Sequence, residues 1–310
     1  MATANRGARR SPFLNWWARR VRALPKGRYW AFLAGWILAG RPARFVGELA
    51  GQPFVVDARD RYTAMHMFLW GTYEPELSLA FVSKLRPGMT VVDVGANKGY
   101  FSVLASRAVL PAGRVVSYEP LPRNFADLAE TATLSGHGNW TCRAAAITSR
   151  HAEVLLRDSA HDLGHSGWAA VAADGTIRID GVTLDDEIES LKLGQLDVLK
   201  MDVEGHEAEV LVGMRQCLAH QRVTHVLIEI HLALLSEADL GSVVAAFRDH
   251  GYRGYILLES PANAAVAAQR IRDGAAADTA FLLREFTQKT LRDAGVTGER
   301  LHMLWTTACD

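Results

Sequence analysis

Cysteine is scarce in this chain of 310 residues, and Cys142, Cys217 and Cys309 show neither paired spacing nor a metal-ligand pattern. This excludes a disulfide framework and predicts free thiols in a reducing cytoplasm. Long hydrophobic runs are also missing. The apolar run Tyr29–Gly40 spans twelve residues, whereas a bilayer-spanning helix needs about 20. We therefore expect no transmembrane helix, and Arg41-Pro42-Ala43-Arg44 is a poor cleavage site for a signal peptide.

Acidic residues are absent from residues 1–47, which hold ten Lys or Arg. The remainder holds 24 basic and 34 acidic residues (24 − 34 = −10), so a basic arm precedes an acidic body. The body gives no reason to expect a nucleic-acid partner. Residues 1–12 are expected to be disordered. Residues 13–44 combine Trp and Arg, which leaves two interpretations: a helical cap on the main domain, or peripheral membrane contact.

The stretch Val91–Tyr100 predicts a buried strand, a glycine turn and the start of a helix. Val91–Val94 is apolar and β-branched, as in a central parallel strand. Gly95 and Gly99 allow the turn, and apolar residues at helical spacing follow it. The glycine spacing D-x-G-x-x-x-G differs from the G-x-G-x-x-G of dinucleotide-binding proteins. The turn therefore predicts a ligand site at a helix N-terminus that is not a typical NAD site.

Strands and helices alternate along the rest of the chain. This pattern predicts a doubly wound, Rossmann-like parallel sheet, whose ligands lie beyond the carboxyl ends of the strands. Helices are expected at 60–85 (interrupted at 71–75), at 122–135, after Thr183, and at 240–247. The expected strands are residues 54–56, 91–94, 114–119, 140–147, 154–156, 176–179, 197–201, 223–230, 255–258 and 280–283. The irregular loop 158–175 is long enough to have a function.

Glu119 closes the second strand of the α/β unit, twenty residues after Gly99. A carboxylate at this position can accept hydrogen bonds from both hydroxyls of a ribose. Together with the glycine spacing, Glu119 indicates an adenosine ligand and favours S-adenosylmethionine (SAM) over NAD.

Three segments in this order resemble the FkbM family of SAM-dependent methyltransferases: Asp93–Tyr100, Tyr118-Glu119-Pro120 and Lys200–Glu207, which contains D-V-E-G-H-E. The motifs Gly71–Glu76, Thr183-Leu184-Asp185 and Ile228–His231 add to the resemblance, which covers residues 55–285. It implies a seven-stranded class I methyltransferase sheet with an N-terminal helical extension. It divides the chain into an arm or cap (1–50), a methyltransferase domain (51–285) and a C-terminal extension packed on that domain (286–310).

The resemblance also implies SAM as cofactor and assigns the residues that hold it. Glu119 would hold the ribose, and Asp93 would lie beneath the loop, where a negative charge suits the positive amine and sulfonium. Tyr73 and Glu74 would close over the methionine end, and Ala145 and Ala146 would pack on adenine. The complete set of cofactor-binding candidates is Tyr73, Glu74, Asp93, Gly95, Ala96, Asn97, Gly99, Tyr100, Glu119 and Ala146.

Methyl transfer to a hydroxyl requires alignment and removal of one proton. The candidate bases at the strand ends are His231, Asp202 and Glu204, with His206 as a weaker candidate. Lys200 is expected to form a salt bridge rather than act in catalysis. A divalent cation held by Asp202, Glu204, Glu229 and His231 is the less favoured alternative, because no tight metal-ligand spacing supports it.

The expected function is O-methylation of a sugar, glycan or natural-product metabolite in the cytoplasm, with contact to the membrane left open. Three alternatives remain: N- or carboxyl-methylation of a peptide or small molecule, a non-catalytic scaffold with the SAM fold, and, as the weakest, a NAD-linked reductase. The sequence does not identify the acceptor or the oligomeric state.

Overall fold

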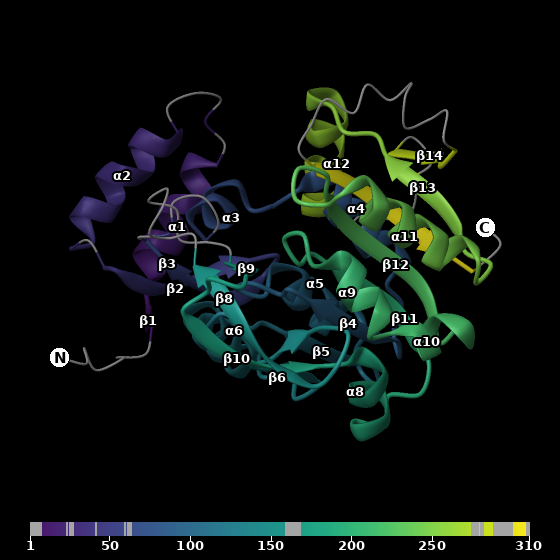
Figure 1. The fold of residues 1–310 in the computed structure, drawn as a ribbon. Coiled ribbons are helices and arrows are strands. Elements are labelled where there is room, and N and C mark those ends of the chain that lie inside the picture. The colour runs from purple at the N-terminus through teal and green to yellow at the C-terminus, as the bar shows by residue number, and fades with distance from the viewer. Residues whose placement is uncertain are drawn as a thin grey trace.

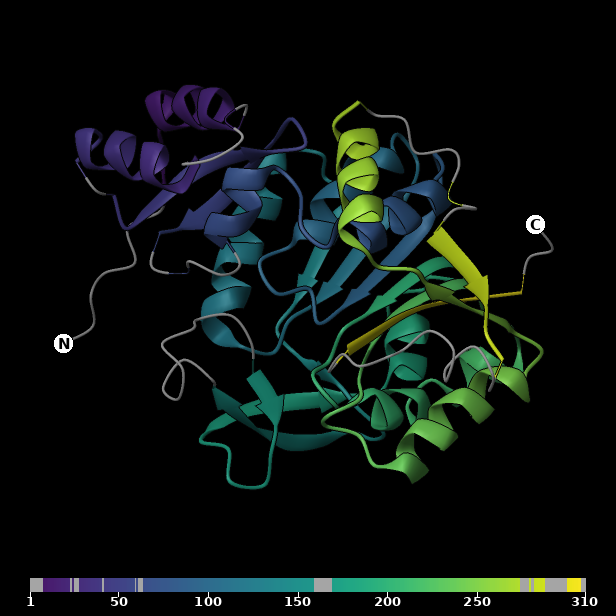
Figure 2. The same ribbon diagram turned by 90° about the horizontal axis from the view of Figure 1, so that it is seen from above.

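The computed structural model describes residues 8–22, 24, 28–40, 42–58, 60, 64–158, 169–273, 279, 282–287 and 300–307. In this part of the chain a large sheet lies at the centre, a smaller sheet with two helices lies at the N-terminal end, and a second small sheet lies beside the large one (Figures 1 and 2).

The large sheet has the order β14-β13-β15-β12-β11-β4-β5-β6. Neighbouring strands from β6 to β12 run parallel, whereas β15 is antiparallel to both β12 and β13. The strands are β4 (Thr90–Val94), β5 (Arg114–Tyr118), β6 (Trp140–Arg143), β11 (Leu196–Met201), β12 (Val223–His231), β13 (Arg253–Leu257), β14 (Leu283–Glu285) and β15 (Arg300–Thr306). The predicted α/β fold class is confirmed, with eight strands in the described residues rather than seven.

The strand β15 corrects the C-terminal part of the prediction. The sequence predicted residues 286–310 as an extension packed on the domain, but Arg300–Thr306 pairs along its length with β12 and inserts between β12 and β13 as part of the large sheet. Pairing between segments so far apart in sequence leaves no local signal. Residues 280 and 281 of the predicted last strand lie outside the described residues, and β14 starts at Leu283.

Helices cover both faces of the large sheet. Successive residues of its central strand point to opposite faces and therefore pack into different hydrophobic clusters. Val91 belongs to the hydrophobic cluster that also contains Phe81 and Phe101, whereas Val92 belongs to the cluster that contains Val210 and Phe247. The helices are α4 (Pro75–Lys84), α5 (Tyr100–Ala108), α6 (Pro122–Ser135), α8 (Leu184–Ser190), α9 (Glu207–Val212), α10 (Arg215–Ala219), α11 (Glu237–Arg248) and α12 (Pro261–Asp273). The predicted start at Thr183 is confirmed, since its side chain accepts a hydrogen bond from the N–H of Asp186.

The N-terminal arm packs on the body of the protein. Leu14 and Phe32 are buried in one cluster with Phe45 and Phe68. The arm also contains strands that the sequence did not predict, so the expected boundary at residue 50 falls in the turn between two paired strands. The elements are β1 (Arg9–Arg10), α1 (Pro12–Val21), α2 (Arg28–Leu38), β2 (Arg44–Leu49), β3 (Gln52–Asp57) and α3 (Ala64–Trp70). Residues 9 and 10, expected to be disordered, pair with β2.

A buried ionic network fixes the arm to α6. The Arg44 side chain on β2 donates to Asp127 at 3.1 Å, and Lys98 of the turn after β4 lies 3.1 Å from the same carboxylate. Lys98 also lies 3.4 Å from Asp60. The side chains of Lys98, Asp60 and Asp127 are almost fully buried. Removing the cation from such a network leaves uncompensated buried charge.

The predicted third strand, residues 140–147, is divided in the structure. Its first half is β6 of the large sheet, and its second half is β7 (Ala146–Ile147) of a small sheet with the order β7-β10-β8-β9. The other strands are β8 (Ala152–Asp158), β9 (Ala169–Val171) and β10 (Ile177–Val182). Residues 159–168 of the predicted functional loop lie outside the described residues.

Two further expectations concern the membrane and the cysteines. Among the described residues, none of the helices combines the length and the hydrophobicity that crossing a bilayer requires. Cys142 and Cys217 are free, and Cys309 lies outside the described residues.

Candidate functional site

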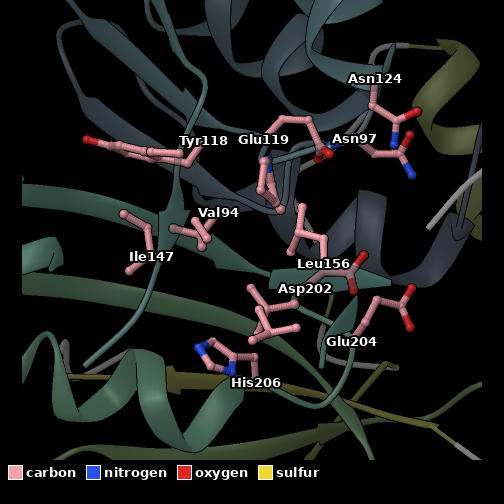
Figure 3. Close-up of a pocket in the computed structure, with 16 residues that line it drawn as sticks. Val94, Asn97, Tyr118, Glu119, Asn124, Ile147, Leu156, Asp202, Glu204 and His206 are labelled. Atoms are coloured by element: carbon pink, nitrogen blue, oxygen red, sulfur yellow. Dashed lines mark hydrogen bonds between the residues drawn. The ribbon is translucent and has the colours of Figure 1, made fainter. Parts of the chain in front are cut away.

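A pocket opens at the carboxyl ends of β4, β5 and β11, where the fold places ligands. Figure 3 shows its lining, with Glu119 and Asn97 on one side and the carboxylates of Asp202 and Glu204 on another. The lining is Val94, Gly95, Asn97, Tyr118, Glu119, Pro120, Asn124, Ala145, Ala146, Ile147, Leu156, Val171, Asp202, Val203, Glu204 and His206.

The loop after β4 packs against the exit of β11, and Gly95 makes this close approach feasible. A Cβ on Gly95 would lie 1.7 Å from the backbone oxygen of Asp202. The φ of Gly95 is +74°, in the left-handed region that other residues rarely adopt. The glycine thus joins two walls of the pocket.

Glu119 lies at the end of β5 and faces the loop. Its carboxylate accepts hydrogen bonds from the backbone N–H groups of Asn97 at 2.8 Å and of Leu121 at 2.9 Å. Burial raises the pKa of Glu119 to about 7, although these hydrogen bonds act in the opposite direction. The carboxylate is therefore held in place, close to its protonation midpoint at neutral pH.

Other predicted cofactor residues support the loop from below. Asp93 is fully buried, accepts a hydrogen bond from Ser102 at 2.6 Å, and lies 3.9 Å from the Lys200 ammonium. Gly99 is the N-cap of α5 with φ 89°. The hydroxyl of Tyr100 is 3.0 Å from Ser78 and stays within a buried network. Asp93, Gly99 and Tyr100 therefore lie outside the pocket lining.

One wall of the pocket is mostly apolar and is formed by β7, β8 and β9. Ala145, Ala146 and Ile147 are buried beside Leu156. His206 also lines the pocket, and its Nε2 lies 2.9 Å from the hydroxyl of Thr148. Burial lowers the pKa of His206, so its imidazole is neutral at pH 7. This wall offers a flat, apolar surface to an aromatic ring.

A cluster of carboxylates and histidines lies at the carboxyl ends of β11 and β12. The Nδ1 of His231 is 2.9 Å from Glu207, and its Nε2 is 3.1 Å from Glu204, 3.5 Å from Glu229 and 3.9 Å from Asp202. Burial lowers the pKa of His231, but its contacts with Glu204 and Glu207 outweigh that effect and raise the pKa to about 10. At pH 7 the imidazole is a cation, which conflicts with the hypothesis that it acts as a base.

Asp202 lies between this cluster and the pocket. Burial raises its pKa to about 6, while Lys200, 3.3 Å away, acts in the opposite direction. The predicted salt bridge of Lys200 is thus confirmed. One carboxylate oxygen of Asp202, Oδ1, is buried without a hydrogen-bond partner. Glu204 follows with φ 53°, a left-handed conformation that costs energy and often occurs at functional sites.

Glu74 also has a left-handed backbone, with φ 41°, and it turns toward β15 rather than lining the pocket. Burial raises its pKa to about 7. Its Oε2 lies 4.0 Å from the Nε2 of His302, and its Oε1 lies 3.9 Å from Arg300. Tyr73 packs edge-on against Tyr100.

The sequence interpretation missed several residues of this region. Arg300 and His302 escaped it because β15 was not predicted, and Leu156 and Val171 of the pocket had no recognisable signal. Glu207 is fully buried at the start of α9. Its place within D-V-E-G-H-E, after the end of β11 and one strand before His231, could have marked it.

A comparison with family models shows to which class of protein this chain belongs. The model of the FkbM methyltransferase domain matches residues 93–253, about half of the chain. The chain belongs to the FkbM methyltransferase family. The predicted family, the methyltransferase class and SAM as its cofactor are thereby confirmed.

Two curated FkbM-family relatives carry functional names. The hexuronic acid methyltransferase AglP of Haloferax volcanii is 31% identical over 160 residues, which cover 49% of this chain and 63% of AglP. The chain thus matches less than two thirds of the length of AglP. The 31-O-demethyl-FK506 methyltransferase FkbM of Streptomyces tacrolimicus is 29% identical over 198 residues, covering 54% of this chain and 74% of the relative.

Similar solved structures are more distant from this FkbM-family chain. A putative SAM-dependent methyltransferase from Streptococcus mutans gives a TM-score of 0.44 at 12% identity, covering 86% of this chain and 56% of that one. A SAM-dependent O-methyltransferase from Thermotoga maritima gives 0.37 at 13% identity, covering 77% of this chain and 67% of that one.

Proposed function

We propose that this protein transfers the methyl group of SAM to a hydroxyl group of a sugar or of another small hydroxylated metabolite. One observation carries the proposal: a single pocket has Glu119 and the Gly95 loop at one side and Asp202 and Glu204 at the other. AglP is named for a hexuronic acid and FkbM for an O-demethyl natural product, and both names support a hydroxylated acceptor.

The pocket residues fit the parts of SAM. The apolar wall formed by Ala146, Ile147 and Leu156 suits the adenine ring, and Glu119 can accept hydrogen bonds from ribose hydroxyls. The methionine part then lies along Gly95 toward Asp202. Carboxylates at that end suit its positive charges, since opposite charges attract strongly in a partly buried site.

SAM, when bound, supplies a methyl group that is already activated by a cationic sulfur. The protein has to position the acceptor oxygen and remove its proton. We assign proton removal to Asp202, because it lines the pocket and its Oδ1 is buried without a hydrogen-bond partner. Asp202 takes the hydroxyl proton, the oxygen electron pair forms the O–C bond, and the C–S electron pair stays on sulfur.

His231 is a positioning residue in this proposal. Its cationic imidazole lies within 4 Å of Asp202, Glu204, Glu207 and Glu229. It therefore holds several carboxylates of the cluster in fixed positions and partly offsets their repulsion. The same geometry makes it a poor proton acceptor at neutral pH.

The proposal is tested with SAM that carries a ¹³C-labelled methyl group and a panel of uronic acids, neutral hexosides and amines. We expect O-methyl products from the hydroxylated compounds and, at saturating SAM, a fall of at least 100-fold in kcat for Asp202→Asn. Methylation of amines alone would refute O-methylation, and unchanged turnover in Asp202→Asn would refute its role as base.

We further propose that α1 and α2 contact the surface of an anionic bilayer. Large apolar side chains are exposed on this arm, with Trp30 at 71% and Leu38 at 78% exposure, and Trp16 is half exposed. Arg20 lies over the ring of Trp16. Exposed aromatic residues beside arginines are typical of helices that lie in the membrane interface, and residues 1–47 contain no acidic group to oppose the attraction.

Deleting the arm would expose the core around Phe32, so point variants give the sharper test. The double variant Trp16→Ser/Trp30→Ser should lose most co-sedimentation with vesicles of anionic phospholipid. Val266→Ser is the matched control, since Val266 is an exposed apolar residue on α12, which is a separate helix from α1 and α2 (Figure 1). Absence of wild-type binding to these vesicles would overturn the proposal.

A further inference from the structure

Three buried side-chain atoms converge beside the proposed acceptor site without hydrogen-bond partners. They are Oε2 of Glu74, Oε2 of Glu229 and Nε2 of His302. The imidazole nitrogen lies 3.2 Å from the Glu229 oxygen and 4.0 Å from the Glu74 oxygen. All three atoms lie within 4.8 Å of one another, a spacing that one metal ion can bridge. His302 and Glu229 form an ion pair at 3.2 Å, whereas the buried Glu74 oxygen is 4.0 Å away, so a cation shared by all three atoms would satisfy them together.

The groups around these atoms are arranged as they are around a bound metal ion. A histidine that binds a metal through one nitrogen usually donates its other N–H to a carboxylate. The Nδ1 of His302 contacts Glu259 in this way, which leaves Nε2 directed at Glu74 and Glu229. Arg300 lies 2.8 Å from Oε1 of Glu229 and 3.9 Å from Oε1 of Glu74, on the oxygens that do not face His302.

The side chains around these three atoms also carry a net negative charge, which favours binding of a cation. Carboxylates outnumber the basic groups even if both imidazoles are protonated. The carboxylates are Glu74, Asp202, Glu204, Glu207, Glu229 and Glu259, and the basic groups are Lys200, His231, Arg300 and His302.

We propose that Glu74, Glu229 and His302 bind a divalent metal ion. Two carboxylates and one imidazole suit Mn²⁺ or Zn²⁺ better than Mg²⁺, which prefers oxygen ligands alone. A second group, Asp202, Glu229 and His231, also lies within bridging distance. The first group is preferred because the members of the second are engaged by groups outside it: Lys200 lies 3.3 Å from Asp202, and the Nε2 of His231 lies 3.1 Å from Glu204.

The role of the ion rests on the proposed methyl transfer, but its binding does not. Three protein ligands leave coordination positions open for water or for an acceptor oxygen. Because Glu229 belongs to both groups, an acceptor hydroxyl held there would lie near Asp202. A bound metal ion lowers the pKa of a coordinated hydroxyl, so the proton would pass to Asp202 more easily.

The test measures Mn²⁺ binding by electron paramagnetic resonance, with untagged, full-length protein that has been treated with chelator and contains no SAM. Mn²⁺ is the probe because the free thiols of Cys142 and Cys217 do not favour it. We expect one saturable site per chain. Absence of saturable binding up to millimolar Mn²⁺ would overturn the proposal and would mean that the cluster is an internal ion-pair network only.

Variants locate the ion. Glu74→Gln and His302→Gln should each weaken Mn²⁺ binding by at least tenfold, and Glu259→Gln by about 10- to 100-fold through loss of support for His302. His225→Gln is the matched control, because His225 is a buried histidine on β12, the strand of Glu229, and its Nδ1 lies 2.9 Å from Thr306 rather than at the cluster. Equal affinities in all variants would refute this location. SAM titrations of the chelated protein report on the proposed function separately.

Discussion

Replacing Glu119 with Gln should weaken SAM binding by about 10- to 100-fold. The carboxylate is 5% exposed and is fixed by the backbone N–H groups of Asn97 and Leu121. Hydrogen bonds to a charged group contribute about 1.5–3 kcal/mol, and each 1.4 kcal/mol is about tenfold in affinity. The amide keeps the shape of the side chain and one acceptor oxygen, but its NH2 group would face one of the two backbone N–H donors, so the change removes the charge and one hydrogen bond.

The pH dependence provides the stricter part of this prediction. Burial raises the pKa of Glu119 to about 7 in the SAM-free protein. Ribose hydroxyls donate to the ionised form, so SAM affinity should fall by up to tenfold per pH unit below pH 7 and level off above it. The contribution of Glu119 to the free energy of unfolding, measured without SAM, should change in the opposite direction and decrease as the pH rises. An unfolded Glu ionises near pH 4.5, so stability decreases by up to about 1.4 kcal/mol per unit as the pH rises from there to 7.

Calorimetric titration with SAM between pH 5.5 and 8.5 measures the affinity, and urea unfolding of the SAM-free protein over the same range measures the stability. The Glu119→Gln variant should show no pH dependence from this position. Glu130→Gln is the control, because Glu130 lies on α6 and contacts Arg44 rather than the pocket; its SAM affinity should match that of the wild type. Unchanged affinity in Glu119→Gln at pH 8 would refute the ribose contact.

Three further predictions concern the loop, the ionic network and the cluster. Gly95→Ala should abolish SAM binding and lower the free energy of unfolding in urea by about 3 kcal/mol, since its Cβ would overlap a backbone oxygen. The control Gly136→Ala has a similar φ but open space around it, and it should lower the free energy of unfolding by about 1 kcal/mol. Lys98→Met should cost about 3–5 kcal/mol in the same assay, because buried carboxylates lose their cation. His231→Ala should lower kcat strongly and retain SAM affinity, and equal turnover would remove it from the mechanism.

The sequence was sufficient to predict three residues that meet in the pocket. Gly95, Glu119 and Asp202 follow the ends of β4, β5 and β11, which are neighbours in the sheet, and local patterns are strong at such strand ends. The turn at Gly99, the interruption before α4 and the cap at Thr183 all follow from local chemistry that a sequence displays.

The rest of the site depends on long-range pairing. Arg300 and His302 reach the cluster because β15 inserts between β12 and β13, and no local pattern identifies the partner of a strand. The sequence likewise could not predict that His231 is protonated, because its contacts with Glu204 and Glu207 in the folded chain raise its pKa. The arm shows the same limit, because β2 and β3 pair across the expected domain boundary.

Methyl transfer itself is the central claim, and one measurement tests it most directly. The protein is incubated with methyl-¹³C SAM and the hydroxylated acceptor panel, and S-adenosylhomocysteine and labelled product are quantified together. The account predicts equal amounts of S-adenosylhomocysteine and O-methylated product, with both reduced by about 10- to 100-fold in Glu119→Gln at subsaturating SAM. Labelled product on nitrogen or carboxyl groups alone, or SAM binding without any transfer across the panel, would contradict it.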